Sequence, residues 1–278
     1  MSGYSISYSN IFKFQLAAAQ KMPPFSYKDY MATVGFSLES ANVVGYSSVQ
    51  TGNGGSKALG ASFAAVADEM NLQDLKVTGY AHEDGFDGEL NIQFLDGLGR
   101  MTDLYNWIDI PADPEDEESV AFFGWYDGED NLVEDVIINP GDGLWVFSSS
   151  DAFGLQSAGQ VIKTPTAGTL KTDGSTMVAN PIPVNVNLQE VSVSGYDHEA
   201  GFEGSINVQF LDGLGRMTDL YNWIDIPADP EDEDSVAFFG WYDGEDNLVE
   251  NVMVNAGTAL WTYSDSNAYS LVFPGVTL

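Results

Sequence analysis

The sequence has 278 residues, of which 42 are Asp or Glu and only 9 are Lys or Arg, so the formal net charge is -33 at pH 7. This balance makes nucleic acid a poor partner, because neutralising phosphates requires clustered Lys and Arg. The chain contains no cysteine, which excludes disulfides and thiolate metal sites. No apolar run reaches the roughly 18 residues of a membrane-spanning helix, so we expect no membrane span.

A long internal repeat organises the sequence. Residues 91–134 recur at 207–250 with two differences, at an offset of 116 residues, and a weaker similarity continues on both sides. A period of this length predicts two tandem domains, because solenoid repeats are much shorter. We therefore expect an N-terminal arm over 1–38, a first module over 39–160 and a second module over 161–278.

Short strands separated by turns are predicted along each module. In the first module, apolar and polar residues alternate over 90–94, which indicates a strand. Further strands are predicted over 101–110, 121–126, 132–138 and 144–147, with a last one near 153–155. Residues 111–118 form a predicted loop, because two prolines and five acids suit neither a helix interior nor a central strand. The predicted fold class is all-β: two tandem β-sandwich, jelly-roll-like modules with an N-terminal extension.

The end of the first module carries the sequence Pro-Gly-Asp-Gly-Leu-Trp at 140–145. With Ile138 before it and Val146 after it, this stretch resembles a strand–turn–strand of bacterial surface and secreted β-sandwich repeat proteins. In those proteins a Pro-Gly-x-Gly-aromatic turn precedes a buried tryptophan. The resemblance implies an extracytoplasmic β-sandwich, although the second copy lacks the proline.

The sequence contains no recognisable signature of catalysis. Its two histidines, His82 and His198, occupy equivalent positions outside any His-rich context. We interpret both as loop histidines. A divalent metal or acid–base role for His82, with Glu83 and Asp84, is the alternative. No GxSxG, HExxH or Walker sequence is present. We therefore expect a protein that is not an enzyme.

Two acidic loops recur in each module and form the candidate metal site. Calcium takes roughly six to eight oxygen ligands, which dense loop carboxylates can supply. The alternative is a solvated acidic face that keeps the protein soluble, and no other cofactor is expected. The candidate calcium ligands are Asp113, Asp116, Asp127, Glu129 and Asp130 in the first module, and Asp229, Asp232, Asp243, Glu245 and Asp246 in the second.

Aromatic residues are concentrated in the repeat, and most are expected in the core. Trp125 and Tyr126 are neighbours on one predicted strand and therefore point to opposite faces. Some of the repeat's aromatic rings must then be exposed or covered by a partner. An exposed aromatic strip either stacks on sugars or forms a subunit interface, and we favour the interface.

The N-terminal arm is mildly basic, with three lysines against one aspartate over residues 1–38. It is attached to a very acidic body. Residues 10–16, with the sequence NIFKFQL, alternate as a strand does. Such a strand can add to an open sheet edge of a neighbouring molecule. The alternative is an arm that packs on its own module. The predicted assembly residues are Phe12, Phe14 and Leu16 on one face and Lys13 on the other.

These features predict a structural, self-assembling subunit of an extracellular filament, surface layer or virion, linked through its N-terminal arm to copies of itself. Two near-identical modules provide the equivalent surfaces that regular assembly uses. The alternative is an acidic adhesin or carbohydrate-binding module, with or without dependence on calcium. A third reading is a soluble protein of a high-salt habitat, whose acidity serves solvation only.

Calcium binding is testable by thermal unfolding. A metal that binds only the folded state raises the melting temperature by mass action. If the acidic loops bind calcium, millimolar calcium chloride raises the melting temperature well beyond sodium chloride of equal ionic strength. Equal shifts of the melting temperature in the two salts would mean that charge screening alone causes them and that the loops do not bind calcium specifically.

Overall fold

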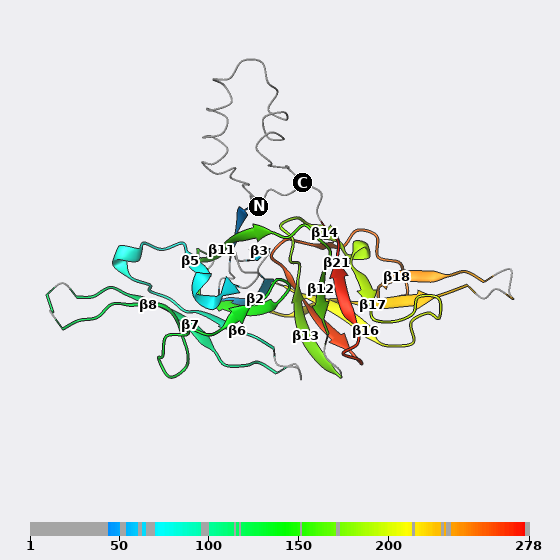
Figure 1. The fold of residues 1–278 in the computed structure, drawn as a ribbon. Helices are drawn as coiled ribbons and strands as arrows, with labels where there is room; N and C mark the ends of the chain where they lie inside the picture. The colour runs from blue at the N-terminus through cyan, green and yellow to red at the C-terminus, as the bar shows by residue number, and fades with distance from the viewer. Residues whose placement is uncertain are drawn as a thin grey trace, which may run out of the picture.

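A computed structural model describes residues 44–50, 54–60, 63–64, 70–95, 100–113, 115–116, 118–150, 152–170, 173–212, 215–228, 231 and 235–275. In this part of the chain the fold is all-β, with several antiparallel sheets (Figure 1). The helices of the same residues are 3₁₀ turns of three residues each: η2 (Leu72–Asp74), η3 (His82–Asp84) and η4 (Leu188–Glu190). None of these helices is long and apolar enough to cross a membrane.

The first copy of the repeat contains two main sheets and a short strand pair. One sheet has the order β2-β10-β6-β7-β8. In the other, β11 lies between β1 and β3 and also pairs with β5, while β4 pairs with β9. The strands are β1 (Val44–Gln50), β2 (Gly55–Gly60), β3 (Phe63–Ala64), β4 (Met70–Asn71), β5 (Lys76–Thr78), β6 (Leu90–Gln93), β7 (Tyr105–Ile110), β8 (Phe122–Tyr126), β9 (Ile137–Ile138), β10 (Gly143–Ser148) and β11 (Gly154–Val161).

The second copy repeats this pairing, except that β3 has no counterpart among its described strands. Its sheets have the orders β13-β20-β16-β17-β18 and β12-β21-β15, and β14 pairs with β19. Corresponding strands therefore pair in the same order, as near-identical sequences require. The strands are β12 (Thr166–Thr169), β13 (Gly174–Ala179), β14 (Val186–Asn187), β15 (Ser192–Ser194), β16 (Ile206–Leu211), β17 (Met217–Ile226), β18 (Phe238–Tyr242), β19 (Met253–Val254), β20 (Ala259–Ser264) and β21 (Ser270–Phe273).

Each copy buries its own apolar cluster, to which both of its main sheets contribute. One cluster draws on residues between 59 and 155, and the other on residues between 170 and 273. Trp125 and Trp241 are fully buried at equivalent places. Their indole Nε1 atoms donate to the carbonyl oxygens of Leu75 (2.9 Å) and Val191 (2.7 Å). The repeat of 91–134 at 207–250 places these two tryptophans at equivalent positions, and the structure confirms that equivalence, whereas the module boundary at 160/161 stays a prediction.

Most predicted strands are present, but the one expected over 132–138 is wrong. Only its last two residues form a strand, β9. The Gln73 side chain explains the difference, because its Nε2 donates to the carbonyls of both Trp125 (2.8 Å) and Val133 (2.7 Å). The segment after the turn is thus held to β8 by this side chain together with one direct backbone bond, from Val133 N to Trp125 O (2.9 Å), in place of a regular ladder.

The two copies meet edge to edge around a local two-fold axis. Gly60 N donates to Gly257 O (3.1 Å), and Ala179 N donates to Gly141 O (2.7 Å). Gly60 and Ala179 end the equivalent strands β2 and β13, while Gly141 and Gly257 are equivalent turn residues. Each copy therefore donates one hydrogen bond to the other and accepts the equivalent one from it. Such reciprocal contacts are characteristic of an isologous interface.

Three alanines, a methionine and two tryptophans fill this interface. Ala58, Met177, Ala179 and Ala259 form a buried cluster of their own, with Trp145 and Trp261 packed against it. The two indole rings meet edge to face with centroids 6.3 Å apart. The tryptophan that the Pro-Gly-Asp-Gly turn was expected to bury is therefore half-buried, against its own counterpart. The two copies extend away from this contact, so the molecule is elongated (Figure 1).

Equivalent positions face each other at the axis, with glycine in the first copy and alanine in the second. A Cβ atom on Gly60 would lie 2.0 Å from the Cβ atom of Ala179. A Cβ atom on Gly143 would lie 2.5 Å from the Cβ atom of Met177 and 2.9 Å from that of Ala259. Two alanines therefore do not fit at either pair of positions, and one glycine in each pair is required by close approach.

We expect Gly60→Ala to lower the free energy of unfolding by about 1–3 kcal/mol, because the new methyl group overlaps Ala179. Adding Ala179→Gly removes the overlapping group and recovers most of the loss, which urea denaturation of both single variants and the double variant measures. Gly128→Ala is the matched control, since a Cβ atom there meets nothing within 4 Å. Equal losses in Gly60→Ala and in the double variant would contradict this packing.

Candidate functional site

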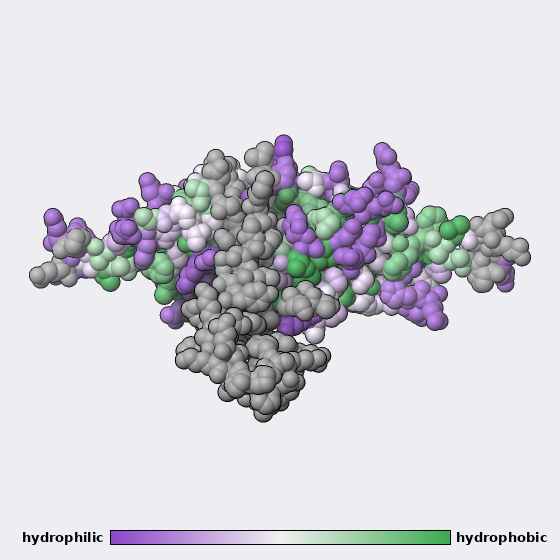
Figure 2. Space-filling model, turned by 90° about the horizontal axis from the view of Figure 1, so that it is seen from above, coloured by the Kyte–Doolittle hydropathy of each residue, from purple (hydrophilic) through white to green (hydrophobic). Residues whose placement is uncertain are grey.

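The most distinctive surface of each copy is a hairpin of two strands that projects from the end of the five-stranded sheet. In the first copy β7 pairs with β8, and in the second β17 pairs with β18. The two hairpins lie at opposite ends of the molecule (Figures 1 and 2). The local two-fold contact therefore presents the same hairpin twice, in opposite directions.

A buried carboxylate supports the base of the first hairpin. Asp109 lies on β7 and is only 2% exposed. The Tyr80 hydroxyl donates to Asp109 Oδ2 (2.6 Å), and His82 Nδ1 contacts the same oxygen. Trp107 Nε1 in turn donates to the Tyr80 hydroxyl (3.1 Å). The carboxylate is thus satisfied by neighbours from another segment, as a buried acidic group requires.

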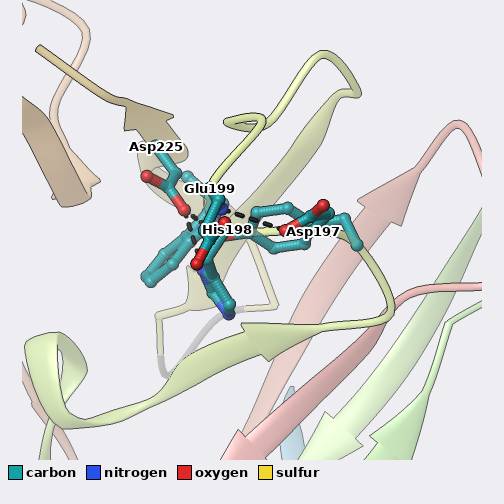
Figure 3. A network of polar contacts seen from close by, with 6 residues as sticks. Asp197, His198, Glu199 and Asp225 are labelled. Carbon is teal, nitrogen blue, oxygen red and sulfur yellow. Dashed lines mark hydrogen bonds and ion pairs between the residues drawn. The ribbon is translucent and has the colours of Figure 1, made fainter. Parts of the chain in front are cut away.

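The second copy contains the same network (Figure 3). The Tyr196 hydroxyl donates to Asp225 Oδ2 at 2.7 Å, and His198 Nδ1 lies 2.8 Å from that oxygen. Trp223 Nε1 donates to Tyr196 at 3.0 Å. With Nδ1 turned to a carboxylate, both histidine side chains remain more than half exposed.

A tight turn places the histidine over the aspartate. His82 begins the 3₁₀ turn η3, and Gly85 follows it with φ +77°. A Cβ atom on Gly85 would lie 2.9 Å from Pro111 Cδ and 3.0 Å from Asp109 O. Phe86 N donates to Asp109 O (2.7 Å) directly after the turn. Glycine is therefore needed where the turn crosses the hairpin.

An exposed phenylalanine, Phe123, lies beside the network. The Phe123 ring packs edge to face on Trp107, with centroids 5.1 Å apart, and lies 4.8 Å from the His82 ring. It is nevertheless 44% exposed. Trp125 and Tyr126, which were expected to point to opposite faces, are both buried. The exposed rings of the strand are Phe122 and Phe123 instead.

Further apolar side chains around these rings are also exposed. Ile110 lies directly opposite Phe122 on the neighbouring strand, and Val120 is 72% exposed. Figure 2 shows apolar atoms on both projecting ends of the molecule. We call this set of exposed residues the hairpin patch: Ile110, Val120, Phe122, Phe123 and Leu132 in the first copy, and Ile226, Val236, Phe238, Phe239 and Leu248 in the second.

The predicted calcium ligands lie on turns, where several carboxylates bond to their own backbone. Asp127 Oδ1 accepts from the backbone N–H groups of Asn131 and Glu129, both at 2.9 Å. The Asn131 side chain also donates to both carboxylate oxygens. The bonds from Asn131, followed by the one from Glu129, hold the pKa of Asp127 below its ordinary value. In the second copy Asp243 accepts from the equivalent residues, Asn247 and Glu245, which likewise lower its pKa.

Those of the remaining predicted calcium ligands that the structure describes are not brought together. Asp113 and Asp116 each accept a hydrogen bond from the backbone two residues ahead. Among the residues that the structure describes, no three His, Asp or Glu side chains are grouped so that they could hold a metal ion. Several predicted site residues lie outside the described part of the chain: Phe12, Lys13, Phe14, Leu16, Asp229 and Asp232.

Sequence reasoning missed the two residues that organise the hairpin, Asp109 and Gln73. A signal for Asp109 is present, because it is the one acid within the otherwise largely apolar or aromatic stretch YNWIDI. At an inward position of a strand, such an acid needs buried partners. No comparable signal exists for Gln73, whose role depends on contacts across 52 residues of sequence.

Comparison of the chain with protein-family models, curated proteins and solved structures finds no match. No function is therefore carried over from a relative.

The Tyr80 and Tyr196 hydroxyls make stability fall at alkaline pH. Burial, followed by the hydrogen bond to Asp109, raises the pKa of Tyr80 to about 12 from 10.0; burial and Asp225 also raise the pKa of Tyr196. The fold keeps a proton that the unfolded chain releases, so this stabilisation is complete below pH 10 and is lost as pH rises toward about 12.

We therefore expect Tyr80→Phe with Tyr196→Phe to flatten the fall in stability above pH 10. At neutral pH the same double variant is less stable, because each lost hydroxyl leaves buried groups without a partner. Urea denaturation across the pH range measures both effects. Tyr263→Phe, outside the network, is the control. An unchanged alkaline slope in the double variant would mean that these hydroxyls do not cause it.

Proposed function

We propose that this chain is a non-enzymatic structural subunit that assembles with copies of itself in an extracellular filament, surface layer or virion. One observation carries the proposal: the hairpin patch occurs twice, at opposite ends of one elongated chain. A monomer gains nothing from two such patches, whereas an assembling subunit needs a contact surface at each end.

The aspartate network suits a positioning role. Asp109 and Tyr80 hold Trp107 and His82, and these two rings support Phe123. A side chain that is exposed yet held in one orientation loses little entropy on binding. We assign the network the task of holding Phe123, and Phe239 in the second copy, in a fixed orientation within the hairpin patch.

We further propose that each copy is a small jelly-roll-like β-sandwich and that the arm over residues 1–38 links neighbouring subunits. The sandwich is supported by the apolar cluster that both main sheets share. The arm is supported by its sequence alone, which combines a net positive charge with alternating apolar residues.

A carbohydrate-binding module or adhesin is the competing function, and the exposed rings of Phe122 and Phe123 favour it. Sugar recognition by stacking also gains from polar groups beside the ring, which Trp and Tyr provide. Here the Trp107, Trp125 and Tyr126 side chains are buried. The exposed rings thus lack a polar group of their own, which makes a protein interface the better fit.

Self-assembly is testable by sedimentation velocity and electron microscopy of the full chain. We expect the average sedimentation coefficient to rise with protein concentration, and to rise further with salt, because salt screens the acidic ends. Phe122→Ser with Phe238→Ser removes one ring from each end and reduces assembly. Val184→Ser is the matched control, since Val184 is exposed but lies outside the hairpin patch.

A chain that stays monomeric at every concentration and salt level would overturn this proposal. Retention of such a monomer on a glycan column would establish the competing function.

A further inference from the structure

The outer part of β8 is an open sheet edge. β8 is the last strand of its sheet. Trp125 N and O both face away from β7, because they bond to the Gln73 side chain at 3.1 and 2.8 Å. Backbone groups alternate between the two sides of a strand, so the N–H and C=O of Phe123 also face away from β7. Among the described residues, nothing bonds to these two groups.

The edge is covered at one end and bare at the other. Gln73 and the Val133 N–H occupy the backbone of Trp125. Gly124, with φ +132°, leaves room for the Gln73 amide, which a Cβ atom would approach to 2.5 Å. Proteins usually block exposed strand edges to prevent unwanted pairing. Here the inner half is blocked by a dedicated side chain, whereas the half that carries Phe123 is left open.

The acidic residues around this edge restrict which kind of strand can bind there. Residues 111–130 contain eight acids and no Lys or Arg, and residues 227–246 have the same count. Pairing two hairpins with each other would bring two such segments together, which like-charge repulsion opposes. A strand that binds here should therefore be extended, apolar on one face and positively charged.

We propose that the open edges at Phe123 and Phe239 accept residues 10–16 of a second copy as an added strand. This inference rests on the proposed assembly and identifies the surface that accepts the N-terminal arm. The segment NIFKFQL places three large apolar side chains on one face and Lys13 on the other, within a stretch of net positive charge. Its backbone would complete the open hydrogen bonds, and its apolar face would cover the exposed ring.

Binding is measured with a labelled synthetic peptide of residues 8–18 and the full chain, by fluorescence anisotropy at protein concentrations below assembly. We expect saturable binding that weakens at least about tenfold in Phe123→Ser with Phe239→Ser. Val184→Ser should bind the peptide as the unaltered chain does. A Lys13→Gln peptide should lose affinity at low salt and little at high salt.

Strand addition is separated from simple apolar contact by two N-methylated peptides. One carries N-methyl groups on residues 11, 13 and 15, and the other on residues 12, 14 and 16. Each set blocks one edge of the peptide strand, so one peptide should bind normally and the other at least about tenfold more weakly. Equal binding of both peptides would overturn the inference.

The outcome for the edge is distinct from the outcome for assembly. If the chain assembles, but the peptide neither binds nor inhibits assembly, the edge inference is wrong and the proposed function stands. If the peptide binds the edge of a chain that never assembles, the edge is an acceptor and the proposed function is wrong.

Discussion

The backbone contact between β2 and β13 is the constraint on which the shape of the molecule depends. Gly60 and Ala179 meet so closely that only one methyl group fits between the strands. This contact sets the orientation of the two copies, because the reciprocal hydrogen bonds to Gly257 and Gly141 form only in that arrangement. The opposed directions of the hairpins follow from it. A shift at the centre would be amplified at the far ends, where the exposed rings lie.

At those ends, charge and apolar surface have opposite effects on association between chains. The hairpin patch favours association, while the eight acids of the same segment resist contact with an identical segment. Carboxylates such as Asp127 also have a local task, since they close turns through their own backbone. The high acidity therefore serves turn formation, beside the solvation that any charged surface gains. In the proposed assembly it would also select between partners.

The strand pattern and the equivalence of the copies were predictable. Strands follow from local residue patterns, and the same patterns occur in both copies of the repeat. The alternation over 90–94 and the aromatic run over 121–126 suffice to place β6 and β8. The strand expected over 132–138 failed because Gln73, distant in sequence, takes the backbone groups that a ladder would use.

The site was less predictable than the fold for the same reason. Asp109, Tyr80 and Trp107 are joined by contacts that span 27 to 29 residues. The edge at Phe123 is open because, among the described residues, no neighbour bonds to the backbone groups on one side of the strand. Residue spacing reveals neither long-range contacts nor missing strand partners. By contrast, the two exposed phenylalanines belong to an aromatic cluster that is visible in the sequence.

The glycine–alanine pairs at the axis carry a consequence for how such a chain can evolve. In a dimer of identical chains, a residue on the two-fold axis faces its own copy, so the pair is two glycines, which leave a gap, or two alanines, which collide. Fusing both copies into one gene removes that restriction. The first copy keeps Gly60 and Gly143 while the second has Ala179 and Ala259, and a single methyl group fills each space. Duplication thus allows packing at the centre of a symmetric body that symmetry itself forbids.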